Sequence, residues 1–106
     1  MMKNATEFEA LTDTADTASP EFDVTVALAV HNEEGHIETE LQRIRDALEP
    51  SEYSYEIIVV DDASTDGSVE ELRRIPDITL IQLAKNRGSG FSRKTATAAA
   101  RGRIVV

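Results

Sequence analysis

Short apolar runs alternate along this chain with segments whose apolar residues recur at helical spacing. The runs are rich in β-branched residues and lack the polar alternation of a half-exposed strand, a pattern typical of strands buried on both faces. They comprise Val24–Val30, Glu56–Val60, Ile78–Leu83 and Ile104–Val106. Regular alternation of buried strands with helices predicts an α/β fold.

Three helical segments are predicted between these strands. The first covers residues 37–48, where apolar residues return every three or four positions. The second is short, and Ser68 with Glu71 matches the pattern of a capping box at its start. The third is rich in alanine and runs through about Arg101, with Gly102 as its C-terminal stop.

Right-handed crossovers between successive strands lay down a parallel sheet with helices on both faces. We therefore expect a Rossmann-like open parallel sheet. Ligands of such sheets bind beyond the carboxyl ends of the strands, where the strand order reverses. The loops to consider are residues 31–35, 61–67 and 84–93, because each follows the carboxyl end of a predicted strand.

Composition limits the chain to one small domain and narrows its chemistry. Hydrophobic residues make up 41% of the 106 positions, which is enough for a single core. The absence of cysteine excludes disulfides, thiolate nucleophiles and zinc sites built on sulfur, and it suits a reducing cytoplasm. No apolar run approaches the roughly 20 residues needed to span a bilayer, so we expect a soluble cytoplasmic chain.

Charge is distributed unevenly along the sequence. The 11 Lys and Arg residues against 20 Asp and Glu residues give a net charge of −9, which argues against nucleic acid as a partner. Residues 1–23 are acidic and are expected to form a disordered leader ahead of a domain at residues 24–106. From Lys85 to Val106 the charge is only basic, which indicates either an anion-binding segment or a solvated helix face.

The densest polar signal is Asp61-Asp62-Ala63-Ser64-Thr65-Asp66-Gly67, at the carboxyl end of the second predicted strand. A calcium loop starting at Asp62 is excluded, because its twelfth position is Arg73, where a carboxylate is required. In a structural interpretation, Asp66 and Ser68 cap the next helix. In a functional one, a carboxylate fixed at a strand end accepts hydrogen bonds from a nucleobase or ribose. Both interpretations stay open.

Glycines and basic residues gather in the loop at residues 85–95. Gly88 and Gly90 would let the backbone approach a ligand closely, and Arg93 with Lys94 at a helix start would favour phosphate. The segment is not a P-loop, which needs Gly before the Lys, nor a G-x-G-x-x-G fingerprint, whose last position is Arg93 here. The alternative is an ordinary strand-to-helix loop.

The order of these pieces resembles a known family. An x-N-E loop after the first strand, V-D-D-x-S-x-D after the second, and Asn86-Arg87-Gly88 with Ser92-Arg93-Lys94 before an Ala-rich helix are similar to the nucleotide-binding half of a family 2 glycosyltransferase with the GT-A fold. The resemblance runs from about Val24 to Val106, and the dolichol-phosphate sugar synthase branch looks closest. It implies an inverting enzyme that uses a nucleotide-diphosphate sugar.

The resemblance also implies where the nucleotide binds. Asp62, with Asp61 beside it, would take the base and ribose, and the first loop would line the same pocket. The family often has a proline and an aromatic residue in that loop, where this sequence has Ala29 and His31. The implied nucleotide-binding residues are Asn32, Glu33, Asp61, Asp62, Ser64, Gly88, Gly90 and Arg93.

The family's D-x-D metal motif follows the strand that begins here at Arg103, and its general base lies further on. We therefore expect this chain to be truncated before the D-x-D motif, with no catalytic residue and no complete metal site. The complete enzyme is expected to use Mg or Mn to stabilise the diphosphate leaving group. The last strand is expected to leave an open sheet edge through which the chain could pair.

The expected partner is a nucleotide-diphosphate sugar, and the acceptor is unidentified, with a lipid phosphate as one option. Membrane association would come through parts outside this chain. A receiver-like signalling module is an alternative, since it also has an acidic pair after its first strand, but it leaves Val24–Leu48 unexplained and places its acceptor Asp beyond Val106. A second alternative is a non-catalytic remnant that binds nucleotide in a regulatory role.

Overall fold

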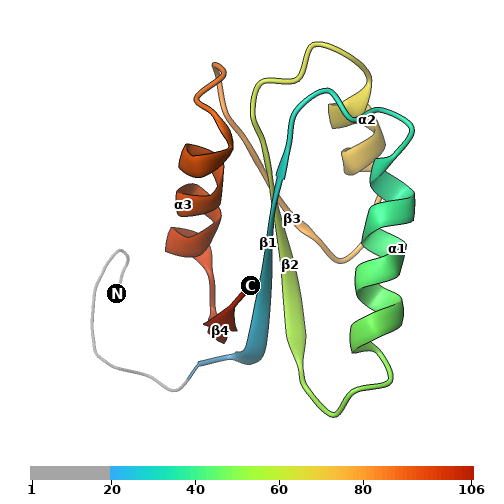
Figure 1. Ribbon diagram of the computed structural model, residues 1–106, viewed down its shortest axis with the longest axis vertical. Coiled ribbons are helices and arrows are strands. Elements are labelled where there is room, and N and C mark those ends of the chain that lie inside the picture. The colour runs from blue at the N-terminus through green and yellow to red at the C-terminus, as the bar shows by residue number, and fades with distance from the viewer. Residues whose placement is uncertain (1–19) are drawn as a thin grey trace.

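The computed structural model describes residues 20–106 (Figure 1). Strands and helices alternate along the whole of this range, as the sequence predicts. The elements are β1 (Phe22–Val30), α1 (Ile37–Leu48), β2 (Tyr55–Asp61), α2 (Ser68–Arg73), β3 (Thr79–Gln82), α3 (Ser89–Ala99) and β4 (Gly102–Val105). The longest helix, α1, has 12 residues, and no helix of the described range is long and apolar enough to cross a membrane.

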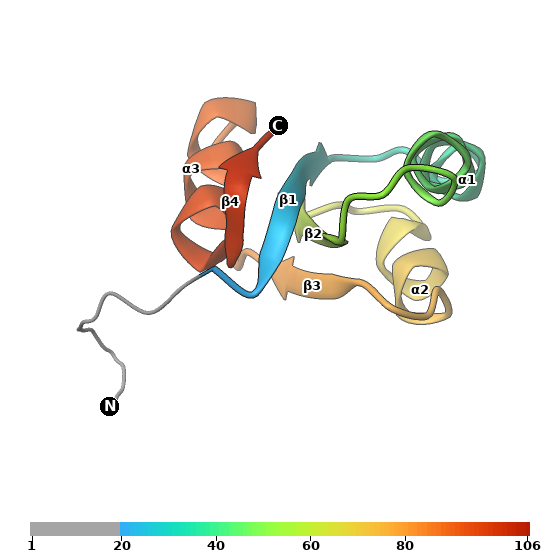
Figure 2. The same cartoon turned by 90° about the horizontal axis from the view of Figure 1, so that it is seen from below.

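The four strands form one parallel sheet in the order β3-β2-β1-β4. Helices α1 and α2 cover one face and α3 covers the other, as Figure 1 and the view from below in Figure 2 show. The chain moves outward from β1 to β3 and then crosses back, so the strand order reverses between β1 and β4. The predicted open parallel sheet with helices on both faces is confirmed.

The core has two parts because β2 is buried on both faces. Ile57 and Val59 pack under α1 and α2, and Ile58 and Val60 pack against Ala96 of α3. All four β2 residues are at most 2% exposed. Each such side chain removed from water contributes about 1.5–3 kcal/mol of hydrophobic stabilisation, so β2 is the strand around which both layers assemble.

Polar side chains join β4 to β1 at the amino ends of the strands. Glu56 of β2 accepts hydrogen bonds from the Thr25 hydroxyl, at 2.6 Å, and from the Arg101 backbone N–H. The Gly102 N–H donates to Thr25 Oγ1 at 2.9 Å. A Cβ at Gly102 would lie 2.5 Å from the Thr25 backbone nitrogen, so only glycine lets β4 approach β1 this closely.

The first strand begins two residues earlier than predicted. Phe22 pairs with Gly102, and Asp23 Oδ2 accepts the backbone N–H of Ser54, so both residues belong to the sheet. The predicted domain at residues 24–106 stays a prediction, and β1 begins two residues before it. The predicted disordered leader otherwise falls on residues 1–19, which lie outside the described residues.

Two local predictions at helix ends are wrong. Ser68 is the first residue of α2, after the N-cap Gly67, and Glu71 bonds to the α1 segment, so no capping box forms. Helix α3 ends at Ala99, and Gly102 starts β4 rather than stopping the helix. In both cases a contact with a distant segment replaces the local pattern.

We predict that Gly102→Ala lowers the free energy of unfolding by about 1–3 kcal/mol, because the new methyl group meets fixed β1 backbone. Gly90→Ala is the matched control. Gly90 lies in α3 with nothing within 4 Å of its Cβ position, so alanine there should be neutral or stabilise by about 0.5–1 kcal/mol. Urea unfolding measures both, and equal stability of Gly102→Ala and wild type would contradict the close approach.

Candidate functional site

The loops after β1, β2 and β3 meet at the carboxyl edge of the sheet (Figure 1). Asp62 joins all three of them. Its backbone N–H donates to Val30 O at 2.8 Å, and its carboxylate accepts the backbone N–H groups of Arg87 and Gly88 at 2.7 and 2.8 Å. The residue is 3% exposed. Hydrogen bonds to a buried carboxylate are stronger than neutral ones, so this contact defines where the third loop lies.

Asp61 holds the turn that follows β2. Its carboxylate accepts the Ser64 N–H at 3.1 Å and the Ser64 hydroxyl at 2.6 Å, and the residue is 1% exposed. Its backbone carbonyl accepts the N–H of Leu83 from β3. The turn includes Ala63 at a positive φ of 55°, a conformation that L-residues seldom adopt. The Asp61 carboxylate therefore stabilises a strained loop directly beside Asp62.

Asn32 links the first loop to the second. Its backbone N–H donates to Ser64 Oγ at 2.9 Å, and its side-chain oxygen accepts the Thr65 N–H at 2.8 Å. Asn32 has φ of 51°, which asparagine tolerates better than most residues. Next to it, a ring nitrogen of His31 lies 2.7 Å from the Asp62 carbonyl oxygen, so His31 Nδ1–H donates there.

A second set of contacts fixes Glu33 and the start of α2. The Glu33 N–H donates to Ser68 Oγ at 2.9 Å, while Asp66 accepts the Ser68 N–H and hydroxyl at 2.9 and 2.6 Å. The Ser68 hydroxyl bond, together with backbone N–H donors, lowers the pKa of Asp66. Partial burial raises the pKa of Glu33, and neighbouring Glu40 adds to the rise.

Glu71 was predicted to cap its own helix, α2, but its carboxylate lies at the start of α1. Its buried carboxylate accepts the N–H groups of Gly35 and Glu38 at 2.9 and 3.3 Å, at the start of α1. A carboxylate at a helix N-terminus accepts hydrogen bonds from backbone N–H groups that have no partner within the helix. Its negative charge is also stabilised by the positive end of the helix dipole. A side chain from α2 thus caps α1, a pairing that no local sequence pattern indicates.

The third loop carries the remaining predicted residues. Gly88 has φ of 93° and precedes α3, so its backbone conformation favours glycine. Gly90 and Arg93 lie in the first turns of α3, and Arg93 is exposed. Arg87 lies over the ring of exposed Phe91, with its guanidinium carbon 5.0 Å from the ring centroid.

Hydrogen bonds join five of the eight predicted residues into two neighbouring sets. Asn32, Ser64 and Asp61 form one connected set, and Asp62 with Gly88 forms another beside it. Glu33 belongs to neither set, because its backbone N–H bonds to Ser68. The roles assigned to these eight residues in nucleotide binding stay predictions, because the contacts described here are internal to the protein.

The carboxylates of Asp61 and Asp62 are not saturated with hydrogen bonds. Each carboxylate oxygen has two lone pairs, and the four oxygens of Asp61 and Asp62 each accept one hydrogen bond from residues 20–106. The second lone pair of each oxygen has no hydrogen-bond donor within this range. Among residues 20–106, no group of three or more ligating side chains is placed to hold a metal ion, so we assign no residue of this range to a metal.

Comparisons with known proteins agree with this geometry. The family described as Glycosyl transferase family 2 matches residues 25–106. Succinoglycan biosynthesis protein ExoO of Rhizobium meliloti (strain 1021) is 39% identical over 85 residues, which cover 78% of this chain and 24% of that protein. Undecaprenyl-phosphate 4-deoxy-4-formamido-L-arabinose transferase of Proteus mirabilis (strain HI4320) is 37% identical over 70 residues, 63% of this chain and 22% of that protein.

A solved structure is similar as well. The mannosyltransferase PcManGT from Pyrobaculum calidifontis, in complex with GDP-Man and Mn²⁺, has a TM-score of 0.64 and 35% sequence identity. The likeness covers 84% of this chain and 27% of that one. The chain thus spans about a quarter of the length of these relatives.

A parallel sheet covered by helices on both faces defines the open α/β class of protein, whose ligands bind beyond the carboxyl ends of the strands. Within that class, the chain belongs to glycosyl transferase family 2 and has the GT-A type of fold. The family match includes β1 and α1, which a receiver module leaves unexplained, so the signalling alternative is not favoured.

We predict that Asp62→Asn lowers the free energy of unfolding by about 1–3 kcal/mol, because an amide group cannot accept both backbone N–H groups. Amide hydrogen exchange should also become faster at Arg87 and Gly88. Asp77→Asn is the control, since Asp77 is exposed with φ of 61° and should change stability by less than about 0.5 kcal/mol. Unchanged exchange at Arg87 and Gly88 would contradict the role of Asp62.

The lowered pKa of Asp66 predicts a pH effect on stability. Its pKa in the folded state is below 3.8, the ordinary value for an aspartate, so its stabilisation is present above that value and is lost as pH falls through the folded pKa. Urea unfolding between pH 5 and pH 2 should therefore show wild type converging on Asp66→Asn as pH falls. A stability difference that stays constant over this range would refute the prediction.

Proposed function

We propose that this chain forms the nucleotide subsite of a glycosyltransferase that transfers sugar from a nucleotide-diphosphate sugar. One observation carries the proposal: buried Asp61 and Asp62 meet the β3–α3 loop at the carboxyl edge, with unused acceptor capacity on every carboxylate oxygen. In this proposal the base and ribose donate to Asp62 and Asp61. Asn32, Glu33 and Ser64 line the pocket from the other two loops.

The diphosphate lies next to the basic third loop and α3 in this proposal. Lys85, Arg87, Arg93 and Lys94 lie between β3 and the second turn of α3, with no acidic residue among them. Backbone N–H groups at a helix N-terminus and nearby cations both favour phosphate. Gly88 and Gly90 let the loop pass close to the ligand. Arg93 is the cation we assign to the diphosphate.

The metal and the acceptor belong to the complete enzyme. We propose that the enzyme uses Mg²⁺ or Mn²⁺, with ligands and general base outside residues 20–106, and that inversion accompanies transfer. The proposed acceptor is a lipid phosphate, supported by the undecaprenyl-phosphate transferase among the relatives. Such an acceptor would bring a cytoplasmic enzyme to the membrane surface through parts that this chain does not contain.

Calorimetric titration with UDP and GDP, each with and without Mn²⁺, tests the nucleotide subsite. We expect one of the two diphosphates to bind more tightly, and Asp62→Asn to weaken that binding about tenfold or more, equal to about 1.4 kcal/mol. Asp66→Asn is the matched control. It removes a carboxylate from the same loop that bonds to Ser68 rather than facing the third loop, and it should change affinity less than about threefold.

Circular dichroism of each variant shows whether weaker binding comes from unfolding. Equal losses in Asp62→Asn and Asp66→Asn, with both variants folded, would refute the assignment of the base to Asp62. Failure of the folded wild-type chain to bind either diphosphate would refute an independent nucleotide subsite in this chain.

A further inference from the structure

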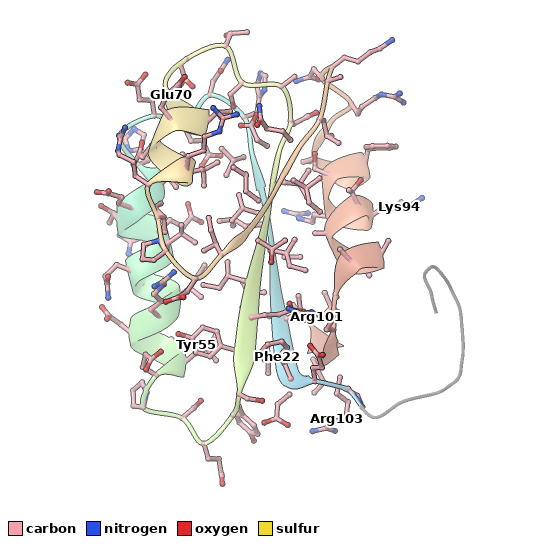
Figure 3. All side chains as sticks on the ribbon, turned by 180° about the vertical axis from the view of Figure 1, so that it is seen from behind. Phe22, Tyr55, Glu70, Lys94, Arg101 and Arg103 are labelled. Atoms are coloured by element: carbon pink, nitrogen blue, oxygen red, sulfur yellow. The ribbon has the colours of Figure 1, made fainter. Side chains whose placement is uncertain are left out.

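A hollow lies beside β2 at the amino end of the sheet, opposite the proposed nucleotide site. Strand β3 pairs with β2 only from Ile58 onward, so within the described part of the chain no strand covers residues 55–57 on that side. The hollow there has a volume of about 370 Å³, and Phe22, Tyr55, Glu56 and Arg101 are among its lining residues. Figure 3 shows Tyr55, Phe22 and Arg101 close together across this end of the molecule.

One buried carboxylate oxygen lines this hollow without a hydrogen-bond partner. Glu56 is 8% exposed, and its Oε2 accepts from Thr25 Oγ1 and from the Arg101 N–H. Its other oxygen, Oε1, has no hydrogen bond within residues 20–106. The nearest cation, Arg101 Nη2, is 3.5 Å away, too far for a strong charge-assisted bond. A buried acceptor without a hydrogen bond costs free energy, so binding of a donor to it is favourable.

The charge around the hollow favours a cationic donor. A smaller adjoining hollow of about 190 Å³ shares Tyr55, Glu56 and Asp77 and adds Glu49 and Arg45. The guanidinium of Arg45 donates to a backbone carbonyl. The lining of the two hollows therefore has three acidic side chains, Glu49, Glu56 and Asp77, and two cationic ones, Arg45 and Arg101.

Arg101 is the cation beside Glu56 Oε1, and its other contacts lie at the surface. Its side chain is 55% exposed, its Nη1 pairs with Glu21, and its guanidinium carbon lies 5.3 Å from the centroid of the Phe22 ring. These are surface contacts, which hold a side chain weakly.

We propose that this hollow binds a lysine side chain of an extended partner peptide. The peptide backbone would pair along the uncovered β2 edge at residues 55–57, as exposed strand edges do with added strands. The lysine ammonium would donate to Glu56 Oε1, the buried oxygen that has no hydrogen bond within residues 20–106. This site shares no residue with the proposed nucleotide subsite.

The probe is the blocked peptide Thr-Val-Lys-Val-Thr, titrated into the 106-residue chain and followed by amide NMR shifts. Its matched control has norleucine in place of lysine, which keeps the alkyl stem and removes the ammonium. We expect the largest shifts at residues 55–57 and 77–79, and binding weaker by about tenfold or more for the norleucine peptide. Equal binding of the two peptides, or shifts confined to the carboxyl edge or to β4, would overturn the proposal.

Glu56→Gln tests the carboxylate directly, with Glu70→Gln as its control. Glu70 is an exposed residue of α2 near the other end of the molecule (Figure 3). We expect Glu56→Gln to lose the preference for the lysine peptide and Glu70→Gln to keep it. Full preference in folded Glu56→Gln would overturn the proposal. Because Glu56 also holds Arg101 and that variant could unfold, the norleucine comparison on the wild-type chain decides the question without it.

Discussion

The Asp62 carboxylate is the contact on which the carboxyl edge of this domain depends. Residues 84–88 of the third loop are all exposed. The hydrogen bonds from the Arg87 and Gly88 N–H groups to Asp62 fix this part of the loop to the end of β2. The same residue continues the backbone pairing of β2 with β1. The backbone of the third loop is therefore held directly beside the acidic pair at the end of β2.

A buried carboxylate also fixes a neighbouring segment at the other end of β2. Glu56 accepts the N–H of Arg101 just after α3, as Asp62 accepts the N–H groups just before it. Only Ser92 and Ala96 of α3 are buried, so its packing against the sheet is limited. Two buried carboxylates, Glu56 in β2 and Asp62 directly after it, thus position the segments that enter and leave α3 and add to the small buried face of the helix.

Periodicity and motif order predicted the element order, the parallel sheet, its two covered faces and the family. Contacts between distant segments were not predictable in this way. The motif at Asp61 and Asp62 indicated an acidic strand end, but their partners depend on how three loops fold together. Glu71 matched a local capping box and instead caps α1, and Gly102 matched a helix stop and instead starts β4. In each case the competing contact lies more than 30 positions away.

The place of β4 beside β1 determines the order in which the sheet can form. Glu21 and Arg101, the residues at the starts of these neighbouring strands, are 80 positions apart. Closing so long a loop has a high entropy cost, and contacts of high sequence separation slow folding. During synthesis β1, β2 and β3 leave the ribosome well before β4. One side of β1 then stays unpaired until Gly102 emerges, and this edge is open to mispairing during that interval.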